Sequence, residues 1–206
     1  IITNANCATT AAVLPLAPLH EAFGIEQVFI ATMQAVSGAG YPGVPSLDIL
    51  GNVIPYIGEE EQKIERELPK MLGNWSGSAI VPAAIGVSAH ANRVPVEHGH
   101  TVCLSVKFRG RVGVTDARAA LDAWRGHTAS RGLPSSLEQP VVVTDLDNRP
   151  QPRRDVWLGR GMGVTVVGLI LLAFASLAQA AWPTTASMAA TARPRFSFGP
   201  SRVAGV

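Results

Sequence analysis

Apolar residues recur along the chain with the two periods that distinguish strands from helices. Residues 101–108 (TVCLSVKF) alternate between polar and apolar positions, the pattern of a half-buried strand. Residues 27–34 (QVFIATMQ) are rich in Val, Ile and Phe and predict a second strand. Further strands are expected just before Cys7 and over residues 79–95, 141–143 and 155–167.

Helical spacing of apolar residues predicts three helices. Residues 59–72 repeat apolar side chains every third or fourth position between charged ones, as in an amphipathic helix. Residues 115–124 begin with a Thr/Asp pair suited to an N-cap. A helix over residues 8–20 is expected to bend at Pro15 and Pro18. Together these elements imply an α+β fold, with a mostly antiparallel mixed sheet and helices on one face. Residues 41–58 predict a long loop.

The pattern changes after residue 166. Residues 163–182 contain no charged residue over 20 positions, which meets the length requirement for a membrane span. An Ala/Thr/Ser/Pro-rich tail follows. We therefore predict a folded domain over residues 1–166 and a divergent tail over residues 167–206. A reading-frame slip, a disordered tail and a membrane anchor remain alternatives for the tail.

Charge and cysteine content narrow the function classes. The 206 residues include 17 Lys+Arg and 15 Asp+Glu, with a formal net charge of +2. Because the basic residues are scattered, the chain is not expected to bind nucleic acid. The two cysteines cannot form a disulfide scaffold, which favours a reducing compartment and a cytoplasmic location. No metal site is predicted.

A few polar residues could support nucleophilic chemistry. Cys7 is expected at a helix N-terminus, where unpaired N–H groups stabilise a thiolate. Arg93 could bind a carboxylate with its planar guanidinium, and His98 or His100 could transfer protons near neutral pH. Each also has an ordinary interpretation: a buried thiol, a surface ion pair and a solvated turn. Sequence spacing alone does not show whether these residues meet.

Five separated segments carry a resemblance to one known family. They are residues 4–10 (NANCATT), 16–24 (LAPLHEAFG), 33–48 (from MQAVSGAGYPG to SLD), 52–63 (NVIPYIGEEEQK) and 92–107 (NRVPVEHGHTVCLSVK). In order and spacing they resemble the catalytic and dimerisation domain of aspartate-semialdehyde dehydrogenases, closest to the fungal and archaeal branch. The resemblance implies the fold of the C-terminal domain of glyceraldehyde-3-phosphate dehydrogenase, while the Rossmann domain for NADP is not found in this sequence.

The resemblance implies three catalytic residues and an arginine that binds substrate. Cys7 would be the nucleophile that forms a thiohemiacetal or thioester, and Gln34 would help to position the substrate beside it. His100 would be the general acid/base. Arg93 would bind the α-carboxylate of the substrate.

Five further residues would bind substrate or cofactor by the same resemblance. Asn6 and Glu60 would contact the substrate, with Glu60 binding its amino group, and Lys63 would bind phosphate. Ser37 and Gly38 would lie close to the cofactor. From the sequence alone, Glu60 and Lys63 could equally form an ordinary surface pair on one helical face.

The activity implied is NADP-dependent conversion of L-aspartate 4-semialdehyde and phosphate into L-aspartyl 4-phosphate. This reaction belongs to lysine, threonine, methionine and isoleucine biosynthesis, and the enzyme would be a homodimer or homotetramer. Two alternatives stay open: an inactive dimerising fragment of that enzyme, and a related acyl-CoA reductase of the malonyl-CoA type. Glu60 and Arg93 favour the amino-acid substrate.

Overall fold

A mixed three-stranded sheet forms the centre of the fold. The computed structural model describes residues 4–167. The sheet has the order β4–β1–β5, with β1 (Ile25–Gln34) between β4 (Gly86–Arg93) and β5 (Thr101–Phe108). Strand β1 is parallel to β4 and antiparallel to β5. The predicted α+β class with a mixed sheet is confirmed.

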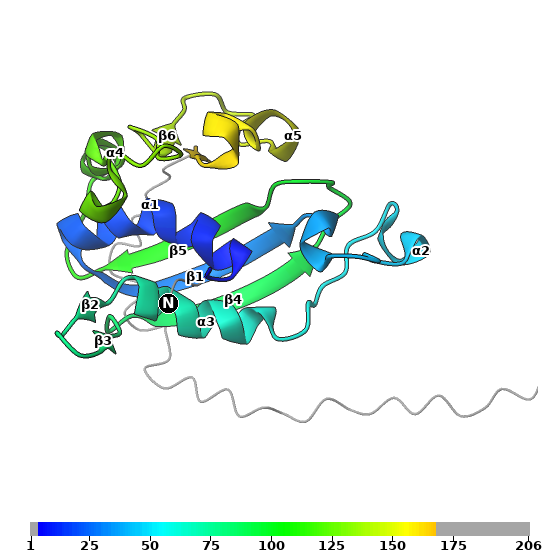
Figure 1. Cartoon of the computed structure of the whole chain (residues 1–206), viewed down its shortest axis with the longest axis horizontal. Coiled ribbons are helices and arrows are strands. Elements are labelled where there is room, and N and C mark those ends of the chain that lie inside the picture. Colours follow the sequence, from blue (N-terminus) through cyan, green and yellow to red (C-terminus); the bar gives the residue numbers. More distant parts are fainter. Residues whose placement is uncertain (1–3, 168–206) are drawn as a thin grey trace, which may run out of the picture. The chain divides into compact units, whose positions relative to one another are not determined.

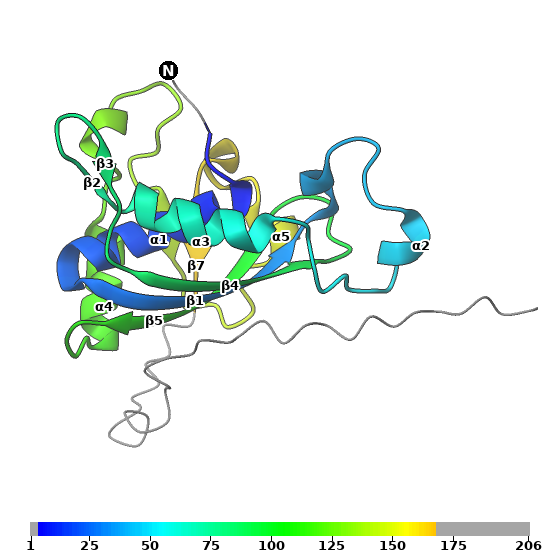
Figure 2. The ribbon, with the colours of Figure 1, turned by 90° about the horizontal axis from the view of Figure 1, so that it is seen from below.

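Two helices cover one face of this sheet. Helix α1 (Cys7–Phe23) and helix α3 (Glu60–Met71) pack against each other and against the strands, as Figures 1 and 2 show. Buried apolar residues of α1 and α3, such as Leu16 and Leu68, meet Ile30 of β1 in the core. The predicted helix after Cys7 is confirmed, and it continues through both prolines.

Strand pairing is less antiparallel than expected. The long connection between β1 and β4 contains α3, and such a crossover lets the second strand run parallel to the first. A second parallel pair joins β6 (Val141–Val143) to β7 (Val164–Val166), whereas β2 (Asn74–Trp75) and β3 (Ile80–Val81) form a short antiparallel pair.

Two of the predicted strands were too long. Residues 79–95 divide into β3 and β4, because Pro82 lies between them and has no N–H for a strand ladder. Over residues 155–167 the prediction was wrong except at β7. Gly159 and Arg160 have positive φ values of 55° and 60°, which are incompatible with an extended strand.

The remaining helical elements are short, apart from α4, which confirms the helix predicted over residues 115–124. They are η1 (Val36–Ala39), α2 (Ser46–Ile49), α4 (Val114–Ala123), η2 (Thr128–Ser130), α5 (Pro152–Asp155) and η3 (Leu158–Gly161). The N-cap predicted for α4 was wrong: Gly113 is the N-cap, and Thr115 and Asp116 lie in the first turn of the helix.

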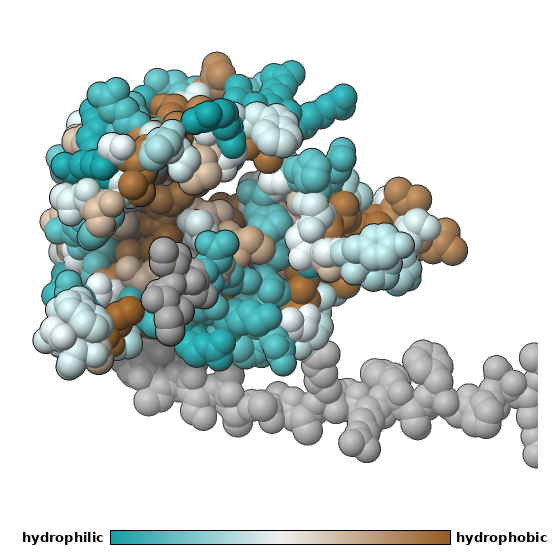
Figure 3. Space-filling view, viewed as in Figure 1, coloured by the Kyte–Doolittle hydropathy of each residue, from teal (hydrophilic) through white to brown (hydrophobic). Residues whose placement is uncertain are grey.

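Residues 41–58 form the predicted loop, interrupted by α2, and project beyond the end of β1 (Figure 1). Figure 3 shows apolar surface at the tip of this projection. The exposed apolar or aromatic side chains of residues 41–58 include Tyr41, Leu47 and Leu50.

Two sequence predictions fall mainly outside the described residues. The strand expected before Cys7 would include residues 1–3, and residues 4–6 have no regular structure. The apolar stretch 163–182 is described only to residue 167. Within residues 4–167, no helix has the length and apolar character needed to cross a bilayer. The domain boundary at residue 166 stays a prediction.

Carboxylates of helix α3 accept hydrogen bonds from backbone N–H groups on the outer edge of β4. The backbone N–H of Ala89 donates to Glu65 and that of Ala91 donates to Glu61, each at 3.1 Å. Farther along the same strand, the N–H and the carbonyl of Arg93 pair with Ile54. When carboxylates accept hydrogen bonds from the N–H groups of an edge strand, those groups can no longer pair with another chain. The same contacts fix the end of β4 that carries Arg93.

A half-buried carboxylate joins α5 to β7. Asp155 accepts hydrogen bonds from the Arg149 guanidinium, the N–H of Gln151 and the hydroxyl of Thr165. These donors, led by Arg149, lower the pKa of Asp155 to about 2. The turn and the strand are thereby held together by one charged side chain.

Replacing Asp155 should make stability depend on pH in a defined way. We expect Asp155→Asn to lower the free energy of unfolding at neutral pH by about 1–2 kcal/mol, because a charge-assisted hydrogen-bond cluster is lost. The pKa of Asp155 is depressed from 3.8 to about 2, so its stabilisation is complete above pH 4 or so and is lost as the pH falls through about 2. Urea unfolding of parent and variant at several pH values measures the difference.

The matched control is Asp145→Asn. Asp145 pairs with Arg118 on the surface and is 79% exposed, so its loss should leave stability unchanged within error. A parent–variant difference for Asp155→Asn that stays constant down to pH 2 would contradict the assignment.

Candidate functional site

The thiol of Cys7 and the imidazole of His100 meet across the fold. Cys7 is the first residue of α1, and His100 immediately precedes β5. The distance between Sγ of Cys7 and Nε2 of His100 is 3.0 Å. Although the two residues are 93 positions apart in sequence, the fold brings together the thiol–imidazole pair that nucleophilic catalysis requires.

Asn6 holds the helix N-terminus at which Cys7 lies. Its Oδ1 accepts the backbone N–H of Ala8 at 2.9 Å and that of Thr9 at 3.0 Å. This is the geometry of an N-cap, which satisfies N–H groups that have no partner within the helix. The placement of Cys7 at a helix N-terminus, predicted from sequence, is confirmed.

Opposing interactions act on the Cys7 thiol. Its surroundings remove enough water to raise its pKa above the ordinary value of cysteine, and the Glu60 carboxylate raises it further. The N–H groups of Ala8 and Cys7 and the charge of Arg93 act in the opposite direction. The net shift is upward, so the neutral thiol prevails at neutral pH.

The backbone of Ala35 determines which nitrogen of His100 carries the proton. The N–H of Ala35 donates to Nδ1 of His100 at 3.1 Å. Because a backbone N–H can only donate, Nδ1 is an acceptor, and the neutral imidazole carries its proton on Nε2, facing Cys7. Burial, followed by the charge of Arg93, lowers the pKa of His100 and favours this neutral form.

Ala35 also fixes Arg93. The Ala35 carbonyl accepts a hydrogen bond from Nη1 of Arg93 at 2.7 Å, and the arginine is only 5% exposed. One peptide segment therefore orients both the guanidinium and the imidazole. Gly38 lies against the same two side chains: a Cβ at this position would come within 3.0 Å of Arg93 Nη1 and 3.1 Å of His100 Cε1. A side chain there would displace one of them.

Glu60 connects several predicted site residues. Its Oε2 accepts hydrogen bonds from Nδ2 of Asn6 at 2.9 Å and from Nε2 of Gln34 at 3.1 Å. Gln34 is buried at the end of β1. Lys63 lies one turn along α3, 3.9 Å from both Glu59 and Glu60. The Glu60 carboxylate thus joins α1, β1 and α3 at one point.

The structure brings most of the predicted residues together. Contacts link Cys7, His100, Arg93, Gln34, Glu60 and Asn6, with Lys63, Ser37 and Gly38 beside them. Of the two candidate histidines, His98 instead lies against Glu97 and Trp157.

Two contributors were missed from the sequence, Ala35 and Glu67. Ala35 acts through its backbone, which leaves no sequence signal. Glu67 accepts the N–H of Asn6, and the only available signal was its position seven residues after Glu60.

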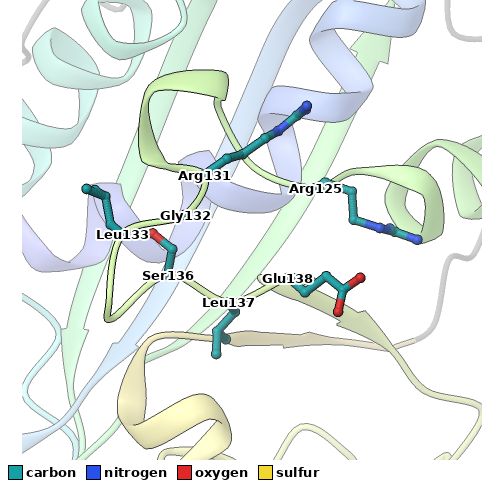
Figure 4. A pocket seen from close by; sticks show the side chains of 7 residues that line it. All are labelled: Arg125, Arg131, Gly132, Leu133, Ser136, Leu137 and Glu138. Carbon is teal, nitrogen blue, oxygen red and sulfur yellow. The ribbon is translucent and has the colours of Figure 1, made fainter.

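Other parts of the described chain do not extend the site. A hollow near η2 has neither cysteine nor histidine among its lining residues (Figure 4). Those residues are Arg125, Arg131, Gly132, Leu133, Ser136, Leu137 and Glu138. Within residues 4–167, no group of three or more His, Cys, Asp or Glu side chains is arranged to hold a metal ion.

Neutralising Glu60 should make Cys7 more reactive. We expect Glu60→Gln, in a chain carrying Cys103→Ser so that Cys7 is the only thiol, to shift the pH midpoint of alkylation by iodoacetamide downward. The carboxylate raises the thiol pKa, and only the thiolate reacts, so the rate near pH 8 should rise about twofold to fivefold. The amide oxygen can still accept the hydrogen bonds of Asn6 and Gln34.

Glu61→Gln serves as the control, because Glu61 binds the β4 edge. It should leave the alkylation profile of Cys7 unchanged. A midpoint that stays in place or moves upward in Glu60→Gln would contradict the assignment.

Known proteins match this chain over most of its described length. Residues 16–170 match the family described as semialdehyde dehydrogenase, dimerisation domain. An aspartate-semialdehyde dehydrogenase from Methanothermobacter thermautotrophicus is 49% identical over 166 residues, covering 81% of this chain and 48% of the relative. One from Cryptococcus neoformans is 48% identical over 175 residues, with the same coverage.

A solved structure agrees with the fold. The crystal structure of aspartate-semialdehyde dehydrogenase with NADP from Candida albicans matches with a TM-score of 0.72 and 41% identity, over 81% of this chain and 48% of that one. The chain therefore spans about half the length of the relatives that it matches. By its sequence and its fold, the chain belongs to the semialdehyde dehydrogenase family and contains that family's dimerisation domain.

Proposed function

We propose that this chain carries the catalytic centre of an NADP-dependent aspartate-semialdehyde dehydrogenase. The reaction converts L-aspartate 4-semialdehyde and phosphate into L-aspartyl 4-phosphate through a thioester on Cys7. The observation that carries the proposal is the 3.0 Å approach of His100 Nε2 to the Cys7 thiol, beside Arg93 and Glu60. The relatives named above carry that enzyme's name.

In the first step the Cys7 thiol loses its proton to solvent, and the resulting thiolate attacks the aldehyde carbon. A C–S bond forms and the carbonyl oxygen becomes an alkoxide, to which the Nε2–H of His100 can donate. NADP, if bound beside Ser37 and Gly38, would supply the acceptor for the hydride that leaves this carbon. Loss of the hydride restores the carbonyl and leaves a thioester on Cys7. Phosphate oxygen then attacks the thioester, the C–S bond breaks and the thiolate is regenerated.

The α-carboxylate and the amino group of the substrate would each bind a side chain of opposite charge. Arg93 would bind the α-carboxylate through the guanidinium edge that the Ala35 carbonyl leaves available. Glu60 would bind the amino group, and its contact with Gln34 places that amide beside the substrate. Binding an ammonium at Glu60 would also offset the charge that raises the Cys7 pKa, so the substrate itself would favour the thiolate.

A hollow on α3 suits the inorganic phosphate. Lys63 and Arg66 line it together with Glu59 and Gln62. The lining has two cations one helical turn apart and one carboxylate, a net positive charge that favours an anion. Lys63 lies 3.9 Å from Glu60, which relates this hollow to the proposed substrate site.

The described residues fit a contact with NADP but not its complete binding site. The N–H groups of Ser37 and Gly38 already donate to the carbonyls of Glu97 and Ala35, so this turn does not offer them to phosphates. Because Gly38 has no side chain, a flat ring could approach Arg93 and His100 closely. We assign Ser37 and Gly38 to this contact alone.

The oligomeric state, the cellular location and the pathway follow from the same proposal. The enzyme would act as a homodimer or homotetramer in the cytoplasm, in the synthesis of lysine, threonine, methionine and isoleucine. The second candidate is an inactive dimerising fragment of that enzyme. The assembled Cys7–His100 pair favours activity. Arg93 and Glu60 favour an amino-acid substrate over an acyl-CoA.

Replacing Cys7 should abolish turnover and thioester formation. We expect the chain to acquire the mass of one aspartyl group when it is incubated with L-aspartyl 4-phosphate, a step that needs no cofactor. Cys7→Ser should not acquire it, whereas Cys103→Ser, which removes the other cysteine, should behave as the parent. Intact-protein mass spectrometry detects the adduct, and NADPH absorbance with semialdehyde, NADP and phosphate reports turnover.

The two readouts separate the candidate functions. A Cys7 adduct with turnover supports the dehydrogenase, and an adduct without turnover shows a working nucleophile that lacks its cofactor partner. No adduct on a folded parent chain would favour the inactive fragment. An adduct that persists in Cys7→Ser would contradict the nucleophile assignment.

Arg93 should matter for aspartyl phosphate and much less for acetyl phosphate, which has no α-carboxylate. We expect Arg93→Lys to slow acylation of Cys7 by L-aspartyl 4-phosphate by about 10-fold to 100-fold, because a lysine cannot reproduce the bidentate contact. Equal slowing with both acyl phosphates would mean that Arg93 acts only by supporting the site.

A further inference from the structure

A second carboxylate of α3 holds the residue that precedes the nucleophile. Oε2 of Glu67 accepts the backbone N–H of Asn6 at 2.6 Å. A short hydrogen bond to an ionised carboxylate is stronger than one between neutral groups. Glu67 is half-buried.

With this contact, both the backbone and the side chain of Asn6 are held by hydrogen bonds. The side chain of Asn6 donates to Glu60 and accepts from the first turn of α1, and its N–H donates to Glu67. Glu60 and Glu67 are seven residues apart, which places them on one stripe of α3 about 10 Å apart along the axis. Two carboxylates of one helix therefore hold the side chain and the backbone of one residue.

Fixation of Asn6 determines the position of Cys7, which follows it directly. The Cys7 thiol depends on the N–H groups of Ala8 and Cys7 to favour the thiolate, and on its 3.0 Å approach to His100. Both depend on where the first peptide groups of α1 lie. If the N–H of Asn6 lost its acceptor, this end of the helix could fray, as helix termini generally do.

We propose that Glu67 is a positioning residue for the nucleophile: by accepting the Asn6 N–H it keeps the Cys7 thiol in line with His100 and with the first N–H groups of α1. The inference rests on the proposed function, in which Cys7 is the nucleophile. Its test reads the thiol directly and needs no turnover, so the two can fail independently.

The test compares three variants in the full chain carrying Cys103→Ser. Glu67→Ala should slow alkylation of Cys7 by iodoacetamide near pH 8 by about threefold to tenfold and move its pH midpoint upward, because thiolate stabilisation is lost. Glu67→Gln retains an oxygen acceptor and should remain within about twofold of the parent rate. This conservative replacement also guards against a failure of Glu67→Ala to fold.

Glu65→Ala is the matched control. Glu65 lies on the same helix and also accepts a backbone N–H, that of Ala89 on β4. Its removal should cost stability, as measured by urea unfolding, and leave the Cys7 profile unchanged. A parent-like profile in folded Glu67→Ala would overturn the proposal. So would equal slowing in Glu65→Ala, or slowing in Glu67→Gln as large as in Glu67→Ala.

Discussion

The structure depends on carboxylates of one helix that accept backbone N–H groups of other elements. Glu61 and Glu65 of α3 bind β4, and Glu67 binds the residue before α1. Helix packing alone would leave α3 able to slide along the sheet, because apolar contacts have little directionality. Hydrogen bonds to fixed N–H groups specify one position. The strand that carries Arg93 and the helix that begins with Cys7 are therefore both located by α3.

A second constraint is the peptide segment at Ala35. It donates to the imidazole and accepts from the guanidinium, so it sets the orientation of a proton donor and of a cation together. The polarity of a peptide bond cannot be reversed, which makes His100 a donor toward Cys7 in its neutral form. In this state the imidazole is better arranged to stabilise negative charge on sulfur or oxygen than to remove a proton from the thiol.

Local features of the fold could be predicted from the sequence, and long-range pairings could not. The helix after Cys7 followed from the spacing of Leu16 and Leu19, and α3 followed from the spacing of Ile64 and Leu68, because these signals lie within a few residues. The parallel pairing of β4 with β1 depends on a crossover more than 50 residues long, which leaves no local pattern. The strand expected over 155–167 was wrong except at β7, because positive φ values at Gly159 and Arg160 are not encoded by apolar periodicity. Proximity of His100 to Cys7 came only through the family resemblance, and the roles of the site residues stay predictions.

The sheet has a second face, opposite α1 and α3. Phe29 and Met33 of β1 are 44% and 37% exposed, although both lie on a central strand. An association that covers such side chains adds a mass-action contribution to stability. If copies of this chain associate through that face, a melting temperature measured at one concentration will not be a constant of the fold. The melting temperature will instead rise with protein concentration.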